Sequence, residues 1–252
     1  MNSRADVNPS LVVSVVSHGH GRMVQSLLQE MAAVSAGVVT RVVLTINVPE
    51  PHEDAFAGNW PFQLELRRNA QPLGFGANHN AALQDAREDF LCVLNPDVGL
   101  LGADPFAALM HAAAQGGQGC AYPAQVDELD RLQDSERTLP TPLALLRRRL
   151  LGREETRVDW VNAACLMFPR RLWQQVQGFD TSYHMYCEDV DMCLRIRLAG
   201  FPLNKAPCSL LHAGTRASHR KWKHLRWHVS SLLRLWSSPA YKAYKRMYAR
   251  RA

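Results

Sequence analysis

Short apolar strands alternate with helix-like segments in the N-terminal part of the chain, and this alternation limits the fold more than any other feature. Leu11–Ser17 (LVVSVVS), Val38–Ile46 (VVTRVVLTI) and Phe90–Leu94 (FLCVL) are rich in apolar and β-branched residues, as strands covered on both faces are. Gln63–Leu66 is a shorter extended segment, and residues 24–31 carry apolar side chains at helical spacing. The alternation predicts an α/β fold with a mainly parallel, doubly wound sheet.

Polar and glycine-rich residues follow these predicted strands. In doubly wound sheets, ligands bind beyond the carboxyl ends of the strands. We therefore expect one edge of the sheet to hold Ser17, His18, Asn47, Asp97 and the loop that contains Gly74, Gly76 and Asn78. That loop lacks the spacing of a dinucleotide fingerprint and the GK[ST] of a P-loop, so a strand-to-helix turn is as good an interpretation as an anion-binding loop.

Three carboxylates share one helical turn at residues 188–191 (EDVD). Behind them, apolar residues recur every fourth position, at Val190, Leu194 and Leu198. Gly200 is expected to end this helix, and the macrodipole at its start favours ionised acids. Two interpretations are open: a plain helix start, in which Asp189 caps and Asp191 pairs with Arg195, or a catalytic turn.

Asp97 and His212 are candidate ligands at strand ends. Asp97 follows a buried strand and a proline, where a carboxylate suits a divalent cation bridging to phosphate oxygens. Asn-Pro-Asp is also ordinary turn chemistry. His212 follows the extended segment Cys208–Leu211, and it is either a structural histidine or a ligand of metal or phosphate.

The charge of the chain is unevenly distributed. Its formal net charge is +6, yet no Asp or Glu occurs after Asp191, whereas residues 192–252 contain 14 Lys and Arg. A basic, acid-free end indicates a polyanionic partner, either an anionic membrane surface or nucleic acid.

Six segments resemble the family 2 glycosyltransferases of the GT-A fold, in particular the bacterial rhamnosyltransferase-like branch. They read VVSHGHG, NAQPLGFGANHNAAL, LNPDV, WVNAACLMFPRRLW, GFDTSYHMYCEDVDMCLRIRLAG and LLHAG, and the resemblance covers about residues 11–215. The segment around the EDVD turn is the most specific of the six. The resemblance implies a Rossmann-like GT-A domain at residues 1–215, followed by a separate extension at residues 216–252.

The resemblance also implies roles for the metal-site and donor-site residues. Asn95-Pro96-Asp97 stands where the family has a DxD-like motif, so Asp97 and His212 would bind Mn²⁺ or Mg²⁺, with Asn95 as a neutral helper. Because Asn95 replaces an acid, a metal-independent enzyme is an open alternative. Asn78 would line the nucleotide-sugar pocket, and Asn162 is a further substrate-binding candidate. Ile46-Asn47 replaces the family's Asp-Asn pair, which leaves the nucleotide open.

For the acid turn, the resemblance implies that Asp189 is the catalytic base, while Glu188 and Asp191 orient the acceptor or hold the helix start. An acceptor hydroxyl would then attack the sugar of a nucleoside-diphosphate donor directly, with inversion. The expected acceptor is a glycan or a lipid-linked molecule of cell-surface polysaccharide assembly. Hydrolysis is the weaker enzyme interpretation, because it needs two carboxylates facing each other across the bond.

The extension is predicted to be a basic amphipathic helix. Its apolar face comprises Trp222, Leu225, Val229, Leu232, Leu233 and Trp236. Tryptophan together with Lys and Arg suits an anionic membrane surface. The alternatives are a helix packed on the domain with a solvated basic face, and a nucleic-acid or anionic-surface binding protein. No zinc-finger or RNP signature is present, so we expect no nucleic acid as partner.

Cellular location is predicted from what the sequence lacks. No apolar run approaches the ~18 residues of a membrane-spanning helix, and the first residues have no apolar signal segment. The six cysteines form no CxxC pair, so we expect reduced thiols. We therefore expect a cytoplasmic protein, peripheral on the inner face of the cell membrane.

Overall fold

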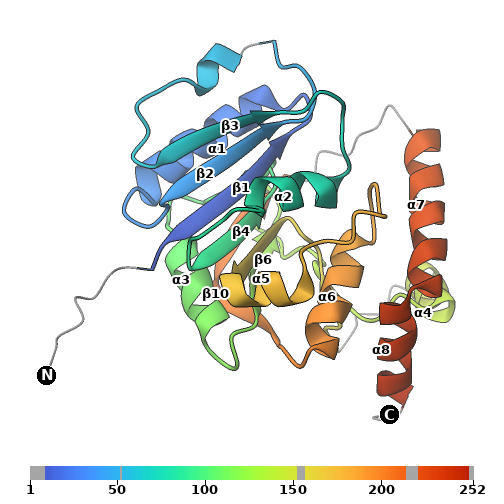
Figure 1. Ribbon diagram of the computed structural model, residues 1–252. Coiled ribbons are helices and arrows are strands. Elements are labelled where there is room, and N and C mark those ends of the chain that lie inside the picture. The colour runs from blue at the N-terminus through green and yellow to red at the C-terminus, as the bar shows by residue number, and fades with distance from the viewer. Residues whose placement is uncertain (1–8, 52, 152–156, 214–220, 250–252) are drawn as a thin grey trace, which may run out of the picture.

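The computed structural model describes residues 9–51, 53–151, 157–213 and 221–249, and Figure 1 shows their arrangement. A central sheet of eight strands runs in the order β3-β2-β1-β4-β9-β6-β10-β5. Helices cover both of its faces. The predicted α/β architecture with a mixed, mainly parallel sheet is therefore confirmed.

The first half of the sheet is parallel and follows the predicted strands closely. It consists of β1 (Leu11–Ser17), β2 (Arg41–Ile46), β3 (Gln63–Arg68) and β4 (Phe90–Leu94), and the intervening helices are α1 (Gly21–Val34), the short 3-10 helix η1 (Glu53–Phe56) and α2 (Phe75–Leu83). The bounds of β1 and β4 agree with the prediction, because continuous apolar runs end there at polar residues.

The second half of the sheet is mixed. Its strands are β9 (Cys165–Pro169), β6 (Cys120–Val126), β10 (Leu203–His212) and β5 (Val98–Gly99), with α3 (Phe106–Ala114) beside them. β9 is antiparallel to both of its neighbours, and β6 and β10 are parallel. Residues 160–168 do not form one continuous strand, because β8 (Trp160–Val161) pairs with β7 (Glu136–Arg137) in a small second sheet.

Two apolar layers hold the domain together. On one face of the sheet α1 and α3 pack through residues such as Leu27, Met31 and Phe106, which are at most 1% exposed. On the other face lie α2, α5 (Arg170–Val176) and α6 (Glu188–Leu198). The strands between them are covered on both faces, as their apolar runs predict.

α6 is buried on two sides. Met192, Cys193 and Ile196 face the sheet, while Val190 and Leu194 belong to a third apolar cluster. The prediction that Leu198 continues the buried face is wrong, because this residue lies in the last turn and is 37% exposed. Past the end of the helix, the Gly200 N–H donates to the Arg197 carbonyl and the Phe201 N–H to the Ile196 carbonyl. Gly200, with φ +89°, thus forms the predicted glycine C-cap.

The C-terminal helices α7 (Lys221–Ser237) and α8 (Pro239–Ala249) lie along α6, on the right of Figure 1. Leu235, Tyr241 and Tyr244 are at most 4% exposed, in the same cluster as Val190 and Leu194. Residues 216–220 and the Trp222 side chain lie outside the described part. α7 and α8 thus share an apolar cluster with α6, and the division of the chain after residue 215 stays a prediction.

The predicted apolar face of α7 is divided between solvent and the domain, since Leu232 and Trp236 pack against the third apolar cluster. Leu225, Val229 and Leu233 are 52%, 48% and 59% exposed, whereas Leu235 is fully buried and Trp236 only partly exposed. The periodicity gave the helix but not its inner face, which depends on contacts with α6. α7 ends at Ser237, and Pro239 is the first residue of α8.

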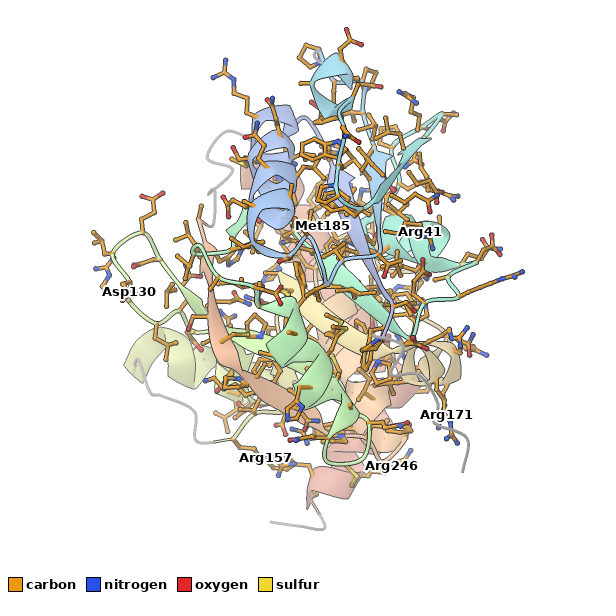
Figure 2. All side chains as sticks on the ribbon, turned by 90° about the vertical axis from the view of Figure 1, so that its left-hand side faces the viewer. Arg41, Asp130, Arg157, Arg171, Met185 and Arg246 are labelled. Atoms are coloured by element: carbon orange, nitrogen blue, oxygen red, sulfur yellow. The ribbon has the colours of Figure 1, made fainter. Side chains whose placement is uncertain are left out.

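A buried carboxylate joins α8 to the rest of the domain. Asp159, which is 0% exposed, accepts hydrogen bonds from the Tyr244 hydroxyl and the Leu139 N–H, each at 2.8 Å. The Arg157 Nε lies 2.8 Å from the same carboxylate. Arg157 and Arg246, a residue of α8, lie at the same lower end of the molecule in Figure 2.

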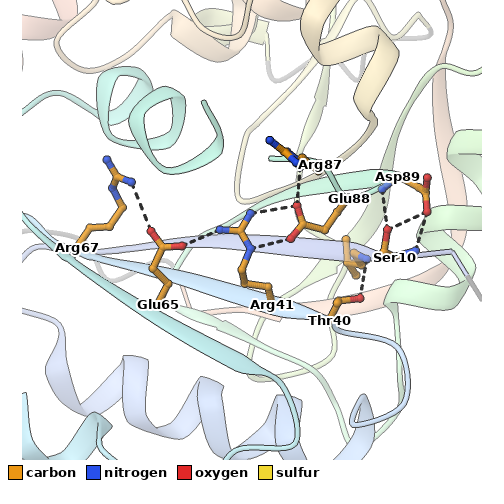
Figure 3. A network of polar contacts seen from close by, with 9 residues as sticks. Ser10, Thr40, Arg41, Glu65, Arg67, Arg87, Glu88 and Asp89 are labelled. Carbon is orange, nitrogen blue, oxygen red and sulfur yellow. Dashed lines mark hydrogen bonds and ion pairs between the residues drawn. The ribbon is translucent and has the colours of Figure 1, made fainter. Parts of the chain in front are cut away.

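An ion-pair network ties the amino ends of the parallel strands (Figure 3). The Arg41 guanidinium contacts Glu65 at 2.7 Å and binds both carboxylate oxygens of Glu88, at 2.7 and 3.0 Å. Nearby, Asp89 accepts the hydroxyl and the N–H of Ser10. These contacts lie at the opposite end of the sheet from the predicted ligand edge.

Candidate active site

The carboxyl ends of the strands bring together most of the predicted donor-site residues. Asn47, at the end of β2, accepts the Leu73 N–H at 2.8 Å and donates to the Leu73 carbonyl at 3.0 Å. Its amide also bonds to Asn69 and to the His18 ring. Asn47 therefore fastens the glycine-rich loop to the sheet, and a direct role in binding substrate stays a prediction.

Glu50 lies at this edge of the sheet and was not among the predicted site residues. Its carboxylate accepts the hydroxyl of Ser17 and the backbone N–H groups of Gly19, His20 and Gly21, the last three at 3.0 to 3.2 Å. The amino end of α1 is thus occupied by a carboxylate of the chain itself. The proline-bounded turn after β2 was the only signal that could have indicated this residue.

Part of the glycine-rich loop is helical. α2 starts at Phe75, so Gly76 and Asn78 lie in its first turn, and the Asn78 side chain donates to the carbonyls of Leu73 and Gly74. The glycines have a packing reason. A Cβ at Gly74 would lie 2.5 Å from the His184 carbonyl oxygen, and one at Gly76 would lie 2.6 Å from the Phe179 Cβ. Close packing explains both glycines, so their binding of a phosphate stays a prediction.

Asp97 and His212 meet, as predicted from their positions after strands. β5 and β10 pair in register, and the His212 Nε2 lies 3.6 Å from the Asp97 Oδ2. The other oxygen of Asp97 is buried without a hydrogen-bond partner. Gln133 accepts from His212 Nδ1 at 3.2 Å and donates to the His212 carbonyl at 2.6 Å. Because Gln133 Oε1 only accepts, Nδ1 is the donor in this contact and Nε2 is the ring nitrogen that faces Asp97.

This donor set fits a divalent cation. A buried carboxylate oxygen without a partner and an imidazole lone pair beside it are ligands that Mn²⁺ and Mg²⁺ accept. Among the described residues, no group of three or more His, Cys, Asp or Glu could hold a metal by itself. The remaining ligands would therefore come from substrate phosphate and water.

Asn95 and Asn162 each make a hydrogen bond that supports the chain around the start of β9. The Asn95 N–H donates to the Ala164 carbonyl at 2.8 Å, which joins β4 to the start of β9. The amides of Asn162 and Gln125 bond to each other in both directions. Asn162 therefore supports the turn before β9, and its contact with substrate stays a prediction.

The acid turn divides into three environments. Glu188 is 7% exposed, and its Oε2 is buried without a hydrogen-bond partner. Asp189 is partly exposed and accepts the Val190 N–H at 2.8 Å. Asp191 pairs with Arg195 at 2.7 Å, which confirms the predicted i,i+4 contact. The helix is capped at Cys187, so the plain structural interpretation holds for Asp191 and not for Asp189.

Burial separates the pKa values of the two neighbouring acids. It raises the pKa of Glu188 to about 8, with the adjacent Asp189 charge adding to the effect. Burial also raises the pKa of Asp189 to about 6, against the lowering effects of the Val190 N–H and of Arg137. The prediction that the macrodipole keeps these acids ionised is wrong for Glu188 at neutral pH, because desolvation is the larger effect.

Aromatic and basic side chains from distant segments surround this turn, and sequence reasoning missed them. Tyr186 contacts the rings of His224 and His228 on α7, at centroid distances of 6.1 and 4.8 Å. Arg137, from β7, acts electrostatically on both Asp189 and His228 and stacks over the Trp160 ring at 5.4 Å. A pairing between β7 and β8 places Arg137 here, and no local pattern indicates it.

The segment that leads into the acid turn contacts the glycine-rich loop. The Phe75 N–H donates to the carbonyl of His184, four residues before Glu188, at 3.1 Å. The strand-end edge of the sheet, which suits a phosphate-bearing ligand, is thus linked to the turn that holds Glu188 and Asp189. The two carboxyls have different pKa values, about 8 and about 6. This arrangement suits group transfer from a phosphate-bearing donor to a hydroxyl.

The sequence relatives of the chain include rhamnosyltransferases, although no model of a known protein family matches it. It is 27% identical to the rhamnosyltransferase WbbL of Escherichia coli K12, over 95% of each chain. It is 26% identical to the N-acetylglucosaminyl-diphospho-decaprenol L-rhamnosyltransferase of Mycobacterium tuberculosis, over 76% of this chain and 71% of that protein.

Solved structures share the fold. The mannosyltransferase PcManGT from Pyrobaculum calidifontis, in complex with GDP-Man and Mn²⁺, matches with a TM-score of 0.65 and 14% identity, over 98% of this chain and 77% of that one. Staphylococcus aureus TarS 1–349 with UDP-GlcNAc matches with a TM-score of 0.60 and 12% identity, over 91% and 67%. At these identities the likeness shows the fold alone, which is GT-A.

Proposed function

We propose that this chain, which is a glycosyltransferase of the GT-A fold, transfers a deoxyhexosyl group of the rhamnosyl kind to a lipid-linked acceptor. It takes the sugar from a nucleotide-sugar donor. The rhamnosyltransferase relatives support the choice of sugar, and the mycobacterial name supports a diphospho-polyprenol acceptor in cell-surface polysaccharide assembly. The observation that carries the proposal is that the segment leading into the acid turn is hydrogen-bonded, through the His184 carbonyl, to the glycine-rich loop.

Asp189 is the base in this proposal. At pH 7 its carboxyl is ionised and partly exposed, whereas Glu188 is buried and protonated. An acceptor hydroxyl that donates to Asp189 gives up its proton as its oxygen attacks the anomeric carbon, and the nucleoside diphosphate leaves from the opposite face. Such a base contributes ~10²–10⁴-fold to the rate. One direct displacement inverts the anomeric configuration.

Glu188 and Asp191 support the base without taking its role. A neutral Glu188 adds no second negative charge next to Asp189, so it does not raise the pKa of the base further. Asp191 holds Arg195, whose guanidinium also donates to the Val176 carbonyl, and this ties the first turn of α6 to α5.

Asp97 and His212 would hold a divalent cation with the donor diphosphate. The cation would supply positive charge to the departing diphosphate. Gln133 fixes the tautomer and the ring orientation of His212. Ser17, His18 and Asn95 remain proposed donor-site residues on the same edge.

Transfer of the sugar can be measured with nucleoside-diphosphate rhamnose and a short-chain analogue of N-acetylglucosaminyl-diphospho-polyprenol. Asp189→Asn should lower kcat by ~10²–10⁴-fold, while nucleoside diphosphate affinity and melting temperature stay near wild type. NMR of the product should show an anomeric configuration opposite to that of the donor. A variant that transfers within about tenfold of wild type means another group is the base, and retention of configuration excludes direct displacement.

The outer face of α7 supports docking on an anionic membrane. Leu225, Val229 and Leu233 form an exposed apolar row at four-residue spacing. α4 (Pro142–Leu151) begins beside this helix, and its Leu143 and Leu146 are each 54% exposed. No helix in the described part of the chain is long and apolar enough to cross a membrane. The row lies in the acid-free part of the sequence, so it complements an anionic lipid surface.

Sedimentation with phosphatidylglycerol-containing vesicles tests this surface. Each nearby Lys or Arg contributes ~1 kcal/mol, decaying over a Debye length of ~8 Å, so binding should weaken as salt is added. The double change Val229→Ser and Leu233→Ser should reduce binding without altering the melting temperature. Leu129→Ser, at a 69% exposed position elsewhere, serves as the control. Equal binding of all three proteins would assign the membrane contact to another surface.

A further inference from the structure

Two residues with Cβ atoms adopt left-handed backbone conformations directly before the acid turn. Tyr186 has φ 72° and Cys187 has φ 66°, and Glu188 follows at once. Residues other than glycine avoid this region, and they stay there only where surrounding contacts hold them. The position of Asp189 therefore depends on contacts that keep this turn in an unfavourable conformation.

α7 supplies such contacts from one face. The Ser231 hydroxyl, on a residue that is 6% exposed, donates to the Met185 carbonyl at 2.8 Å. The Tyr186 hydroxyl and His224 Nδ1 are hydrogen-bonded at 2.7 Å, and the His228 ring meets the Tyr186 ring edge-on at 4.8 Å. Positions 224, 228 and 231 recur at helical spacing, so they lie on one face of α7. That face covers the Met185 carbonyl, the Tyr186 hydroxyl and the Tyr186 ring.

The opposite side of the turn is held by the donor-side loop. The His184 carbonyl accepts the Phe75 N–H, and its ring lies 4.9 Å from the Trp227 ring of α7. α7 is itself anchored below this contact, because Leu235 is fully buried and the Trp236 Nε1 donates to the Pro140 carbonyl. The turn is thus clamped between α2 and a fixed C-terminal helix.

We propose that α7 is a positioning element of the active site, in which Ser231 and His224 hold the left-handed turn at Tyr186–Cys187 and thereby set the place of the Asp189 carboxylate. This inference rests on the proposed function, since it gives α7 a purpose only if the acid turn is catalytic. It assigns to the C-terminal helix a part in the chemical step that is separate from membrane docking on its outer face.

The expected signature is a fall in kcat without a loss of donor binding. Donor-side contacts lie on the sheet edge and in the glycine-rich loop, whereas α7 touches the segment before the base. A base displaced by about 1 Å lowers the rate by up to ~10²-fold. Ser231→Ala should therefore lower kcat by roughly 10–100-fold, while the donor KM stays within about twofold.

Ser231→Ala is paired with Ser230→Ala on the same helix. Ser230 is exposed, and within the described part of the chain its hydroxyl bonds only to the Trp227 carbonyl of the same helix. All variants are assayed as full-length protein in the same detergent with the same acceptor analogue, together with melting temperatures and the nucleoside diphosphate Kd. Ser230→Ala should match wild type.

A second pair removes one hydrogen bond from either end. Tyr186→Phe and His224→Leu should each lower kcat, and the double variant should be no slower than the slower single variant, because both remove the same contact. Additive losses would show that the hydrogen bond between them does not act as one unit.

The outcomes separate this inference from the proposed function. If Asp189→Asn is inactive and Ser231→Ala has wild-type kcat, α7 does not position the base. If both variants are active, the proposed base is wrong, and α7 is left with a structural role. A lower melting temperature with unchanged kcat in Ser231→Ala would likewise overturn the positioning role.

Discussion

Tyr244→Phe tests whether α8 belongs to the folded domain. The change removes one hydroxyl, which donates to Asp159 at 2.8 Å in a site where both residues are 0% exposed. It leaves the ring and its packing in place, so little cavity forms. A hydrogen bond to a charged group contributes about 1.5–3 kcal/mol. Asp159 keeps its contacts with Leu139 and Arg157, so we expect a loss in the middle of this range.

The loss can be measured by urea unfolding. About 2 kcal/mol corresponds to a melting temperature lower by about 4–8 °C for a domain of this size. Tyr241→Phe is the matched control, because Tyr241 is equally part of the α8 contact but has no hydroxyl contact among those found in the described residues. If Tyr244→Phe unfolds within about 0.5 kcal/mol of both wild type and control, α8 is not held by Asp159 and the argument for a shared core fails.

Two further changes probe the site. Burial raises the pKa of Glu188 from 4.5 to about 8, so the folded protein opposes ionisation of this carboxyl and loses stability as the pH rises through that interval. Glu188→Gln should therefore be more stable than wild type at pH 8 but not at pH 4. An equal difference in unfolding free energy at both pH values would refute this. Gln133→Ala should weaken nucleoside diphosphate binding about 10–100-fold in Mn²⁺ and little without it, as measured by calorimetry. Leu132→Ala, at an exposed position, is the control. Equal affinity of the two variants in Mn²⁺ would show that His212 does not need Gln133 to bind the metal.

The features of the fold that could be predicted are those that depend on residues close together in the sequence. β1 and β4 begin and end where continuous apolar runs do. The meeting of Asp97 and His212 followed from the rule that strand carboxyl ends share an edge. The pairing of Asp191 with Arg195 followed from helical spacing.

The missed features depend on contacts between segments far apart in sequence. Phe75 begins a helix among glycines because Asn78 and the His184 carbonyl bond to that loop. Periodicity over α7 could not identify its inner face, because Tyr186 and α6 decide which side is covered. For the same reason the roles of Arg137 and Gln133 had no local signal, and that of Glu50 had only the proline-bounded turn around it.

The Arg41 network has an evolutionary consequence. It ties the amino ends of β2, β3 and β4 through Glu65 and Glu88, while every candidate substrate contact of the sheet lies at the opposite ends. Loops at the carboxyl ends can therefore be exchanged, lengthened or recoded without disturbing the ion pairs that hold the strands in register. Proteins that descend from a common ancestor with this sheet can therefore change their sugar and acceptor while the ion pairs at the amino ends of the strands stay the same.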